Sequence, residues 1–166
     1  MAVQTTYNWT TGRGIAGGLV DLTPHAINSF INEEDNGVLK PGMAVMQGTT
    51  PGKTIKKFAS TGTAETFEGV VNNNRTTEYD LDGHIRILKG AGTGVLEWGR
   101  IYVLVTPEAE VAYGDPVYIT ATGDNAGTFN KTSGIALKGK FLGPVENGIA
   151  PVELYNQANE TPADNG

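Results

Sequence analysis

Hydrophobic residues recur along this chain in short, strand-like runs. From Val38 onward, apolar and polar positions alternate or form brief apolar segments, which clusters of Gly, Pro, Asn and Asp separate. The strongest run covers residues 95–105, where β-branched and aromatic side chains dominate and Gly99 and Arg100 interrupt the pattern. Turn signals at intervals of about 8–12 residues are typical of a sandwich or a barrel. We therefore predict an all-β chain.

The composition narrows the fold class. The chain has 23 Gly and 8 Pro among its 166 residues. Glycine weakens helices and strand interiors but permits tight turns, so this usage favours many short strands joined by turns. Long helical patterns do not alternate with the strands, which argues against a doubly wound α/β fold. We predict a single β-sandwich or barrel-like domain of short antiparallel strands, with an irregular N-terminal arm and at most one short helix.

The pattern divides the chain into three parts. Residues 1–36 are predicted to form an irregular arm and a short helix over residues 23–31, with a threonine N-cap and Pro24 in the first position. Residues 37–155 are predicted to form the β domain. Residues 156–166 have almost no apolar content and are predicted to be a disordered tail.

Charge and residue usage exclude several classes of partner. The formal net charge is −6, and the densest basic group, Lys53, Lys56 and Lys57, is too small to bind a phosphate backbone, so we predict no nucleic-acid partner. No apolar stretch reaches the roughly 18 residues of a membrane span, and no signal peptide is expected. The chain lacks Cys, which removes thiol chemistry and is compatible with assembly in a reducing cytoplasm.

The motifs that could carry chemistry lack the context that the chemistry needs. Residues 12–17 match G-x-G-x-x-G but neither follow a buried strand nor begin a helix. Residues 48–54 resemble a phosphate-binding loop with one residue too few between its glycines, and we interpret them as a lysine-bearing hairpin turn. His25 and His84 have no metal-ligand pattern around them. The sequence therefore predicts no enzyme, no cofactor and no metal site.

The N-terminal arm carries the candidate residues for a partner contact. Tyr7 and Trp9 lie in a polar segment flanked by glycines, where no local core would shelter them. Aromatic side chains in such a segment favour an anchor in a partner surface. Arg13 can form charge-assisted hydrogen bonds there, and Ile15 completes the predicted set.

Five stretches of the β domain carry a resemblance to a known family. They are F-E-G-V-V at 67–71, G-D-P-V-Y at 114–118, G-T-F at 127–129, and the closing segments at 135–141 and 148–154. In this order they resemble the bacteriophage capsid decoration (head-stabilising, cement) proteins, over roughly residues 38–155.

The resemblance implies a structural virion protein that binds the exterior of a phage head and stabilises the expanded capsid shell. It implies the major capsid protein as a partner, self-association into a homo-oligomer (a trimer in preference to a dimer) and no catalytic residues. It also implies a place on the outer capsid surface after synthesis in the bacterial host cytoplasm.

Two alternatives stay open. A carbohydrate- or receptor-binding β module of a phage tail or baseplate would be favoured by Trp98 and Tyr102 lying exposed and side by side. A hydrolase could use the adjacent carboxylates of Glu33, Glu34 and Asp35, although a solvated turn explains them as well.

Overall fold

The chain folds into β-strands joined by turns. The computed structural model describes residues 14–74, 78–79 and 81–157, and among these residues there is no helix. The strands are β1 (Ala26–Asn32), β2 (Ala44–Gln47), β3 (Thr54–Lys57), β4 (Phe67–Val71), β5 (Glu78–Tyr79), β6 (Ile85–Arg86), β7 (Gly92–Leu104), β8 (Pro116–Ile119), β9 (Phe129–Asn130), β10 (Ile135–Phe141) and β11 (Ile149–Leu154). The all-β class predicted from the sequence is confirmed.

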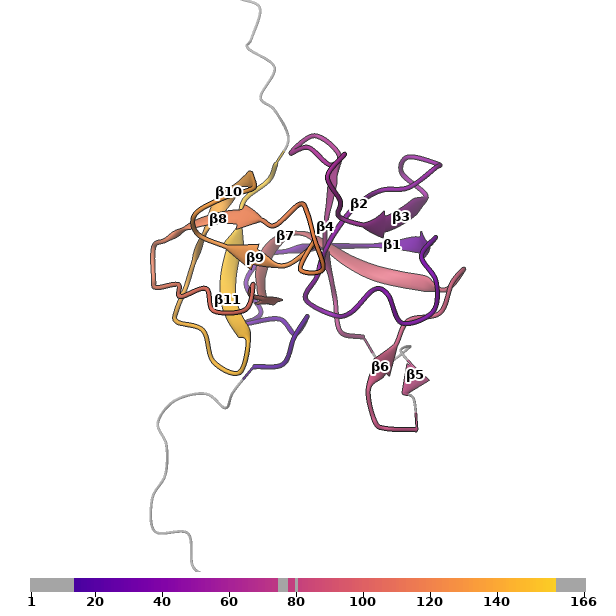
Figure 1. Ribbon diagram of the computed structural model, residues 1–166, viewed down its shortest axis with the longest axis horizontal. Helices are drawn as coiled ribbons and strands as arrows, with labels where there is room; N and C mark the ends of the chain where they lie inside the picture. The colour runs from indigo at the N-terminus through magenta and orange to yellow at the C-terminus, as the bar shows by residue number, and fades with distance from the viewer. Residues whose placement is uncertain (1–13, 75–77, 80, 158–166) are drawn as a thin grey trace, which may run out of the picture.

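The first half of the chain closes into a small barrel. The strands follow one another in the order β1, β3, β2, β4 and β7, and β7 pairs with β1 again, which completes the ring. This barrel lies on the right in Figure 1, in indigo to pink. Closure leaves no free strand edge on this ring, so its backbone groups are paired internally.

The second half of the chain curls around the other end of β7. Strands β11, β10, β8 and β9 follow β7 in that order, and a single bridge between Val105 and Phe129 brings β9 back beside the end of β7. This unit lies on the left in Figure 1, in orange and yellow. The fold is therefore two barrel-like rings that share one strand.

The backbone of β7 changes partners in its middle. Its first half pairs with β1 and β4, and its second half, from Gly99, pairs with β11. The register against β1 shifts between Leu96 and Trp98, so Glu97 forms a bulge. Gly99 has a φ of 127°, and a side chain there would meet His25. The bulge and the glycine redirect the strand from one ring into the other.

Two groups of buried side chains stabilise this arrangement. The smaller group lies in the first ring, where Leu39 from a loop packs against side chains of the strands. Its members are Phe30, Leu39, Val45, Ile55, Val71, Ile87 and Val95. The larger group fills the second ring and continues across β7 to the first, through Leu96, Val70 and Phe67. Since hydrophobic stabilisation grows with the apolar area removed from water, this continuous packing makes the two rings one folding unit.

The short helix predicted over residues 23–31 is wrong. Residues Ala26–Asn32 form β1, in which Phe30 and Asn32 are buried while Ser29 and Ile31 are exposed. That burial has a period of two, and the segment between two strands of the ring has to be extended to complete the pairing. Local capping signals were overridden by this non-local pairing.

The observed sheet differs in two further details from the short antiparallel strands that the sequence predicts. Strand β1 runs parallel to β3, and β7 is one continuous strand of 13 residues despite the interruption in its pattern. The lysine-bearing turn at residues 48–54 is confirmed, because it joins the antiparallel strands β2 and β3.

Gly69 provides a test of the contact between β4 and β7. Its φ is 147°, and a Cβ would collide with the carbonyl oxygen of Leu96. We expect Gly69→Ala to lower the free energy of unfolding by roughly 2–4 kcal/mol, because the backbone is strained and the strands must separate. Urea denaturation measures this. The matched control is Gly92→Ala, which meets no atom within 4 Å and should change stability by about 0.5 kcal/mol or less; equal effects would contradict the explanation.

Candidate functional site

Residues 17–20 lie along the second half of β7, on the side away from β11. The backbone N–H of Gly17 donates to the carbonyl of Tyr102 (2.8 Å), and the backbone N–H of Tyr102 donates to the carbonyl of Gly18 (2.9 Å). The backbone N–H of Val20 donates to the carbonyl of Arg100 (3.1 Å). A bridge between Leu19 and Ile101 confirms that the segment runs antiparallel to β7. We call residues 14–21, which include this paired segment, the arm root.

Asparagine and glycine fix the position of the arm root. The backbone N–H of Asn73 and the side-chain amide of Asn72 both donate to the carbonyl of Gly17, at 2.8 and 3.0 Å. Gly17 has a φ of 72°, and a Cβ at Gly14 would collide with the ring of Tyr102. Only glycine allows the backbone to approach so closely. The position of the arm root is therefore set by the sheet.

A group of charged side chains stabilises the end of the arm root. Arg100 on β7 contacts Asp21 at 2.8 Å and Glu153 on β11 at 3.3 Å, and Lys140 on β10 lies 3.8 Å from the same Glu153. Hydrogen bonds from the side chain of Thr23 and from Arg100 lower the pKa of Asp21 to about 2. The two carboxylates raise the pKa of Arg100. These ion pairs connect the arm root to three strands.

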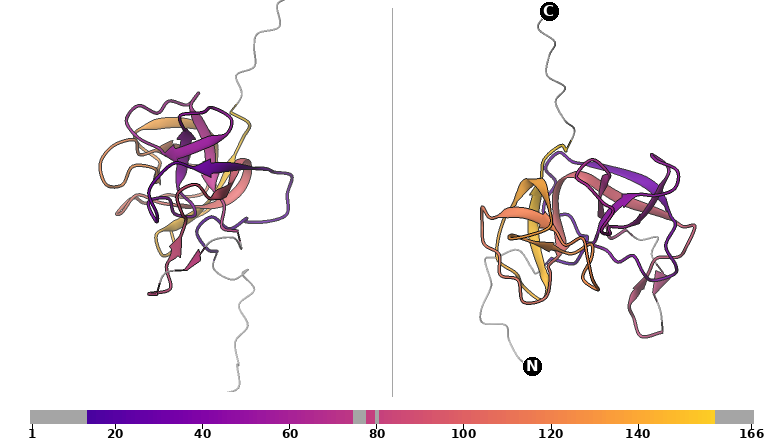
Figure 2. Two further views of the ribbon diagram at one scale, coloured as in Figure 1. Left: turned by 90° about the vertical axis from the view of Figure 1, so that its right-hand side faces the viewer. Right: turned by 45° about the horizontal axis from the view of Figure 1, so that its top comes forward.

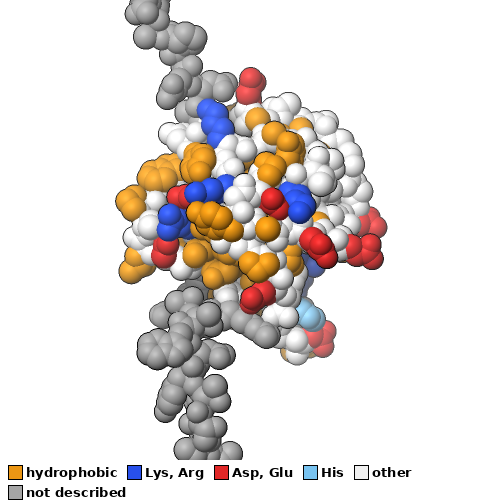
Figure 3. Space-filling model, turned by 90° about the vertical axis from the view of Figure 1, so that its left-hand side faces the viewer, with side chains coloured by type: hydrophobic (Ala, Val, Ile, Leu, Met, Phe, Trp, Pro, Cys, Tyr) orange, Lys and Arg blue, Asp and Glu red, His pale blue; other side chains and the backbone are white. Residues whose placement is uncertain are grey.

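The face that β8, β10 and β11 form is partly apolar. Figure 3 shows hydrophobic side chains gathered over it, with basic and acidic side chains between them. Tyr113 is 70% exposed and Tyr155 is 46% exposed, and the Lys140 ammonium lies 5.4 Å from the centre of the Tyr113 ring. Exposed aromatic residues beside a cation are typical of protein–protein contact surfaces.

Exposed apolar side chains also occur near the arm root and on a projecting hairpin. Ile15 is 61% exposed and Leu22 is 93% exposed. Strands β5 and β6 form a separate two-stranded hairpin that stands off from the rings (Figures 1 and 2), and Tyr79 and Leu81 are exposed on it. Each of these positions offers apolar surface to a partner.

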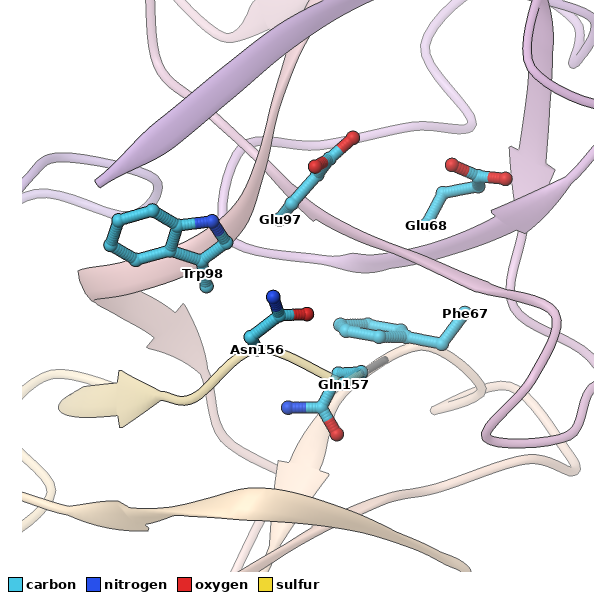
Figure 4. A pocket seen from close by; sticks show the side chains of 6 residues that line it. All are labelled: Phe67, Glu68, Glu97, Trp98, Asn156 and Gln157. Carbon is cyan, nitrogen blue, oxygen red and sulfur yellow. The ribbon is translucent and has the colours of Figure 1, made fainter. Parts of the chain in front are cut away.

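A pocket of about 190 Å³ lies between the two rings (Figure 4). Strand β4 contributes Phe67 and Glu68, β7 contributes Glu97 and Trp98, and the segment after β11 contributes Asn156 and Gln157. Burial and the nearby charge of Glu97 raise the pKa of Glu68.

Gln157 fixes the wall of this pocket. Its side-chain oxygen accepts from the backbone N–H of Lys138 (2.9 Å), and its side-chain nitrogen donates to the carbonyl of Lys138 (2.8 Å) and to that of Tyr155 (2.5 Å). The amide thereby satisfies backbone groups at the edge of β10 in the way that a neighbouring strand would.

Only one of the four predicted partner-binding residues belongs to the part of the chain that the structure describes. Tyr7, Trp9 and Arg13 lie outside the described residues, and Ile15 is exposed in the arm root. Nothing in the sequence indicated the exposure of Tyr113, Tyr155 or Leu22, since exposure depends on which strands become neighbours.

The residues proposed for a carbohydrate-binding module do not lie together, and those proposed for a hydrolase stabilise the fold. Trp98 lines the pocket, whereas Tyr102 is half-buried beneath Gly14, so the platform of two adjacent exposed rings is not observed. Glu33 accepts hydrogen bonds from Thr49, and bonds from Thr54 and Thr49 lower its pKa. Glu33 therefore supports the turn between β2 and β3, while Glu34 accepts from the backbone N–H of Lys57 and Asp35 pairs with Lys89.

Within the described residues, the structure contains neither a cluster of metal-binding side chains nor a membrane-spanning helix. His25 Nδ1 lies 2.8 Å from the carbonyl of Thr23, and no group of three or more His, Cys, Asp or Glu side chains could hold a metal ion in the part of the chain that the structure describes. Among the same residues, no helix is long and apolar enough to cross a membrane.

Comparison with known proteins agrees with this architecture. A family model described as structural cement protein (E217 gp24/Pam3 gp6) matches residues 3–155. A chain in the capsid of Myoviridae phage XM1 has a similar fold, with a TM-score of 0.67 and 20% identity over 95% of this chain and 100% of that one. The N base of the head fiber gp8.5 of bacteriophage phi29 aligns less well, with a TM-score of 0.43 and 12% identity over 82% of this chain and 99% of that one. No curated protein matches.

These findings define the class of protein as a structural component of a phage head. The chain belongs to the phage structural cement protein family, because the family model covers nearly its whole length. It is a structural virion protein that stabilises the capsid, and the resemblance read from the sequence is confirmed.

The ion pair between Asp21 and Arg100 provides a second test. Because the pKa of Asp21 in the folded protein, about 2, is below its ordinary value of 3.8, its stabilising effect is present above pH 4 and is lost as the pH falls towards 2. We expect Asp21→Asn to reduce stability at pH 7 by about 1 kcal/mol or less, since the side chain is partly exposed, and to match the wild type near pH 2.

Urea denaturation at pH 7, 4 and 2 measures this difference. The control is Glu110→Gln, which removes an exposed carboxylate in the loop between β7 and β8. A deficit in Asp21→Asn that persists undiminished at pH 2 would contradict the assignment of the effect to the charged carboxylate.

Proposed function

We propose that the chain binds the outer surface of an expanded phage head, where its partner is the major capsid protein, and that it does so as a closed homo-oligomer, a trimer in preference to a dimer. The observation that carries this proposal is the arm root. Its hydrogen bonds to β7 hold residues 17–20 in one place, and Ile15 is exposed nearby in the sequence. A fixed arm root lets the aromatic residues Tyr7 and Trp9 reach a partner from a rigid base.

Binding to one state of the shell is sufficient for stabilisation. A protein that binds the expanded shell and not its precursor favours the expanded state by mass action. When several copies are joined, contacts to several capsid subunits form at a high effective concentration, so modest individual contacts give firm attachment. No bond has to be made or broken in this process, and we propose that the chain acts without catalysis.

The partly apolar surface supports self-association. Tyr113 and Tyr155 lie exposed on the second ring, and two exposed side chains, Tyr79 and Leu81, lie on the projecting hairpin. Large apolar side chains that stay exposed at two separate places of a small protein are compatible with contacts to other copies at both places.

Removal of residues 1–13 tests the role of the arm. We expect the truncated protein to bind expanded, undecorated heads at least tenfold more weakly, because it lacks Tyr7, Trp9 and Arg13. Its thermal unfolding should match the full chain, since the pairing with β7 begins at Gly17. Co-sedimentation with heads measures the binding, with the variant lacking residues 158–166 as the control. Full uptake of the truncated protein would contradict the role of the arm.

The oligomeric state is tested separately. Sedimentation equilibrium of the full chain should give three times the mass of one chain, and dilution should not dissociate it at the concentrations at which it binds heads. A monomer at those concentrations would refute the closed oligomer without affecting the proposed attachment to the shell.

A further inference from the structure

The pocket between the rings combines a negative charge with aromatic walls. In Figure 4 the carboxylates of Glu68 and Glu97 lie along one side, Asn156 lies on the other side, and the rings of Trp98 and Phe67 lie at the two ends, while the amide of Gln157 turns away from the carboxylates. These residues come from three separate segments whose positions are fixed by the sheet. The pocket is therefore a built feature of the fold.

Within the part of the chain that the structure describes, neither carboxylate forms an ion pair with a basic side chain. Glu97 accepts a hydrogen bond from the side-chain amide of Asn28 at 2.6 Å. Burial, offset in part by the nearby Gln47 side chain, raises the pKa of Glu68. The ion pairs found among residues 14–74, 78–79 and 81–157 use other carboxylates. Two like charges in a partly buried site are unfavourable unless a cation joins them.

The remaining walls favour a flat cation. Trp98 lines the pocket and is half-buried, and an indole ring attracts a positive charge. The ring of Phe67 is buried and packs against Phe58, with 6.4 Å between ring centres, so little of its face is available to a ligand. A guanidinium group can stack on an aromatic ring while its several N–H groups donate to two carboxylates, and it is less strongly hydrated than an ammonium.

We propose that this pocket receives an arginine side chain of the shell protein. The inference rests on the proposed attachment to the shell, and it adds a second contact that is independent of the arm. The guanidinium would donate to Glu68 and Glu97 and lie beside the indole of Trp98. The volume of about 190 Å³ suits a guanidinium group with part of its aliphatic stem.

The pocket can be tested without any capsid. Trp9 and Trp98 are the two tryptophans of the chain, so the Trp9→Phe variant reports the fluorescence of Trp98 alone. At low salt we expect N-acetyl-arginine amide to change this fluorescence with saturation, and N-acetyl-citrulline amide, its neutral isostere, to bind at least tenfold more weakly. The double variant Glu68→Gln/Glu97→Gln should lose the response to arginine, and Glu110→Gln should retain it.

The other outcomes of the titration overturn the proposal. An equal response to citrulline, or an unchanged response in the double variant, would show that charge does not govern the pocket. Binding of a neutral disaccharide in place of arginine would indicate a carbohydrate site instead. Should the double variant unfold, Glu97→Gln alone carries the test, because Glu97 is only half-buried.

Binding to expanded, undecorated heads then separates the two proposals. If the wild type binds heads, the double variant should bind at least tenfold more weakly and Glu110→Gln should bind normally; equal binding of the double variant would refute the arginine contact and leave the proposed function intact. If the wild type does not bind heads, the proposed function fails, while the response to N-acetyl-arginine amide still decides whether the pocket accepts a guanidinium.

Discussion

The structure depends on one strand that serves two rings at once. Strand β7 pairs with β1 and β4 along its first half and with β11 and the arm root along its second. The bulge at Glu97 and the backbone of Gly99 allow the change of partners. Both the arm root and the pocket lie along this strand, so the features that we connect with shell binding are positioned by the same backbone that holds the fold together.

The general class of fold could be predicted because strand periodicity and turn residues are local signals. The pairing could not, since which strands become neighbours depends on contacts between distant parts of the chain. Residues 23–31 show the difference. Their capping signals favoured a helix, but closure of the first ring required an extended segment, and the burial of Phe30 and Asn32 follows that requirement. Likewise, Gly99 interrupts the pattern of residues 95–105 but only bends a continuous strand.

The class of protein could be predicted from the sequence, because the family resemblance at residues 67–71 and 114–118 led to the family that the comparison shows. The partner-binding set of Tyr7, Trp9, Arg13 and Ile15 stays a prediction. The pocket could not be foreseen, because Glu68 and Glu97 lie on different strands and become neighbours only through the pairing of β4 with β7. The ion pairs of Arg100 with Asp21 and Glu153 could not be predicted either, because these residues are far apart in the sequence.

The direction of the arm root bears on how the protein withstands force. Residues 17–20 run antiparallel to β7 and share several hydrogen bonds with it. A pull on the arm along the axis of β7 loads these bonds in shear, so that they must break together, whereas a pull perpendicular to the strand would peel them apart one at a time. Mechanical resistance of the attachment would then depend on the angle at which a neighbouring molecule draws the arm away.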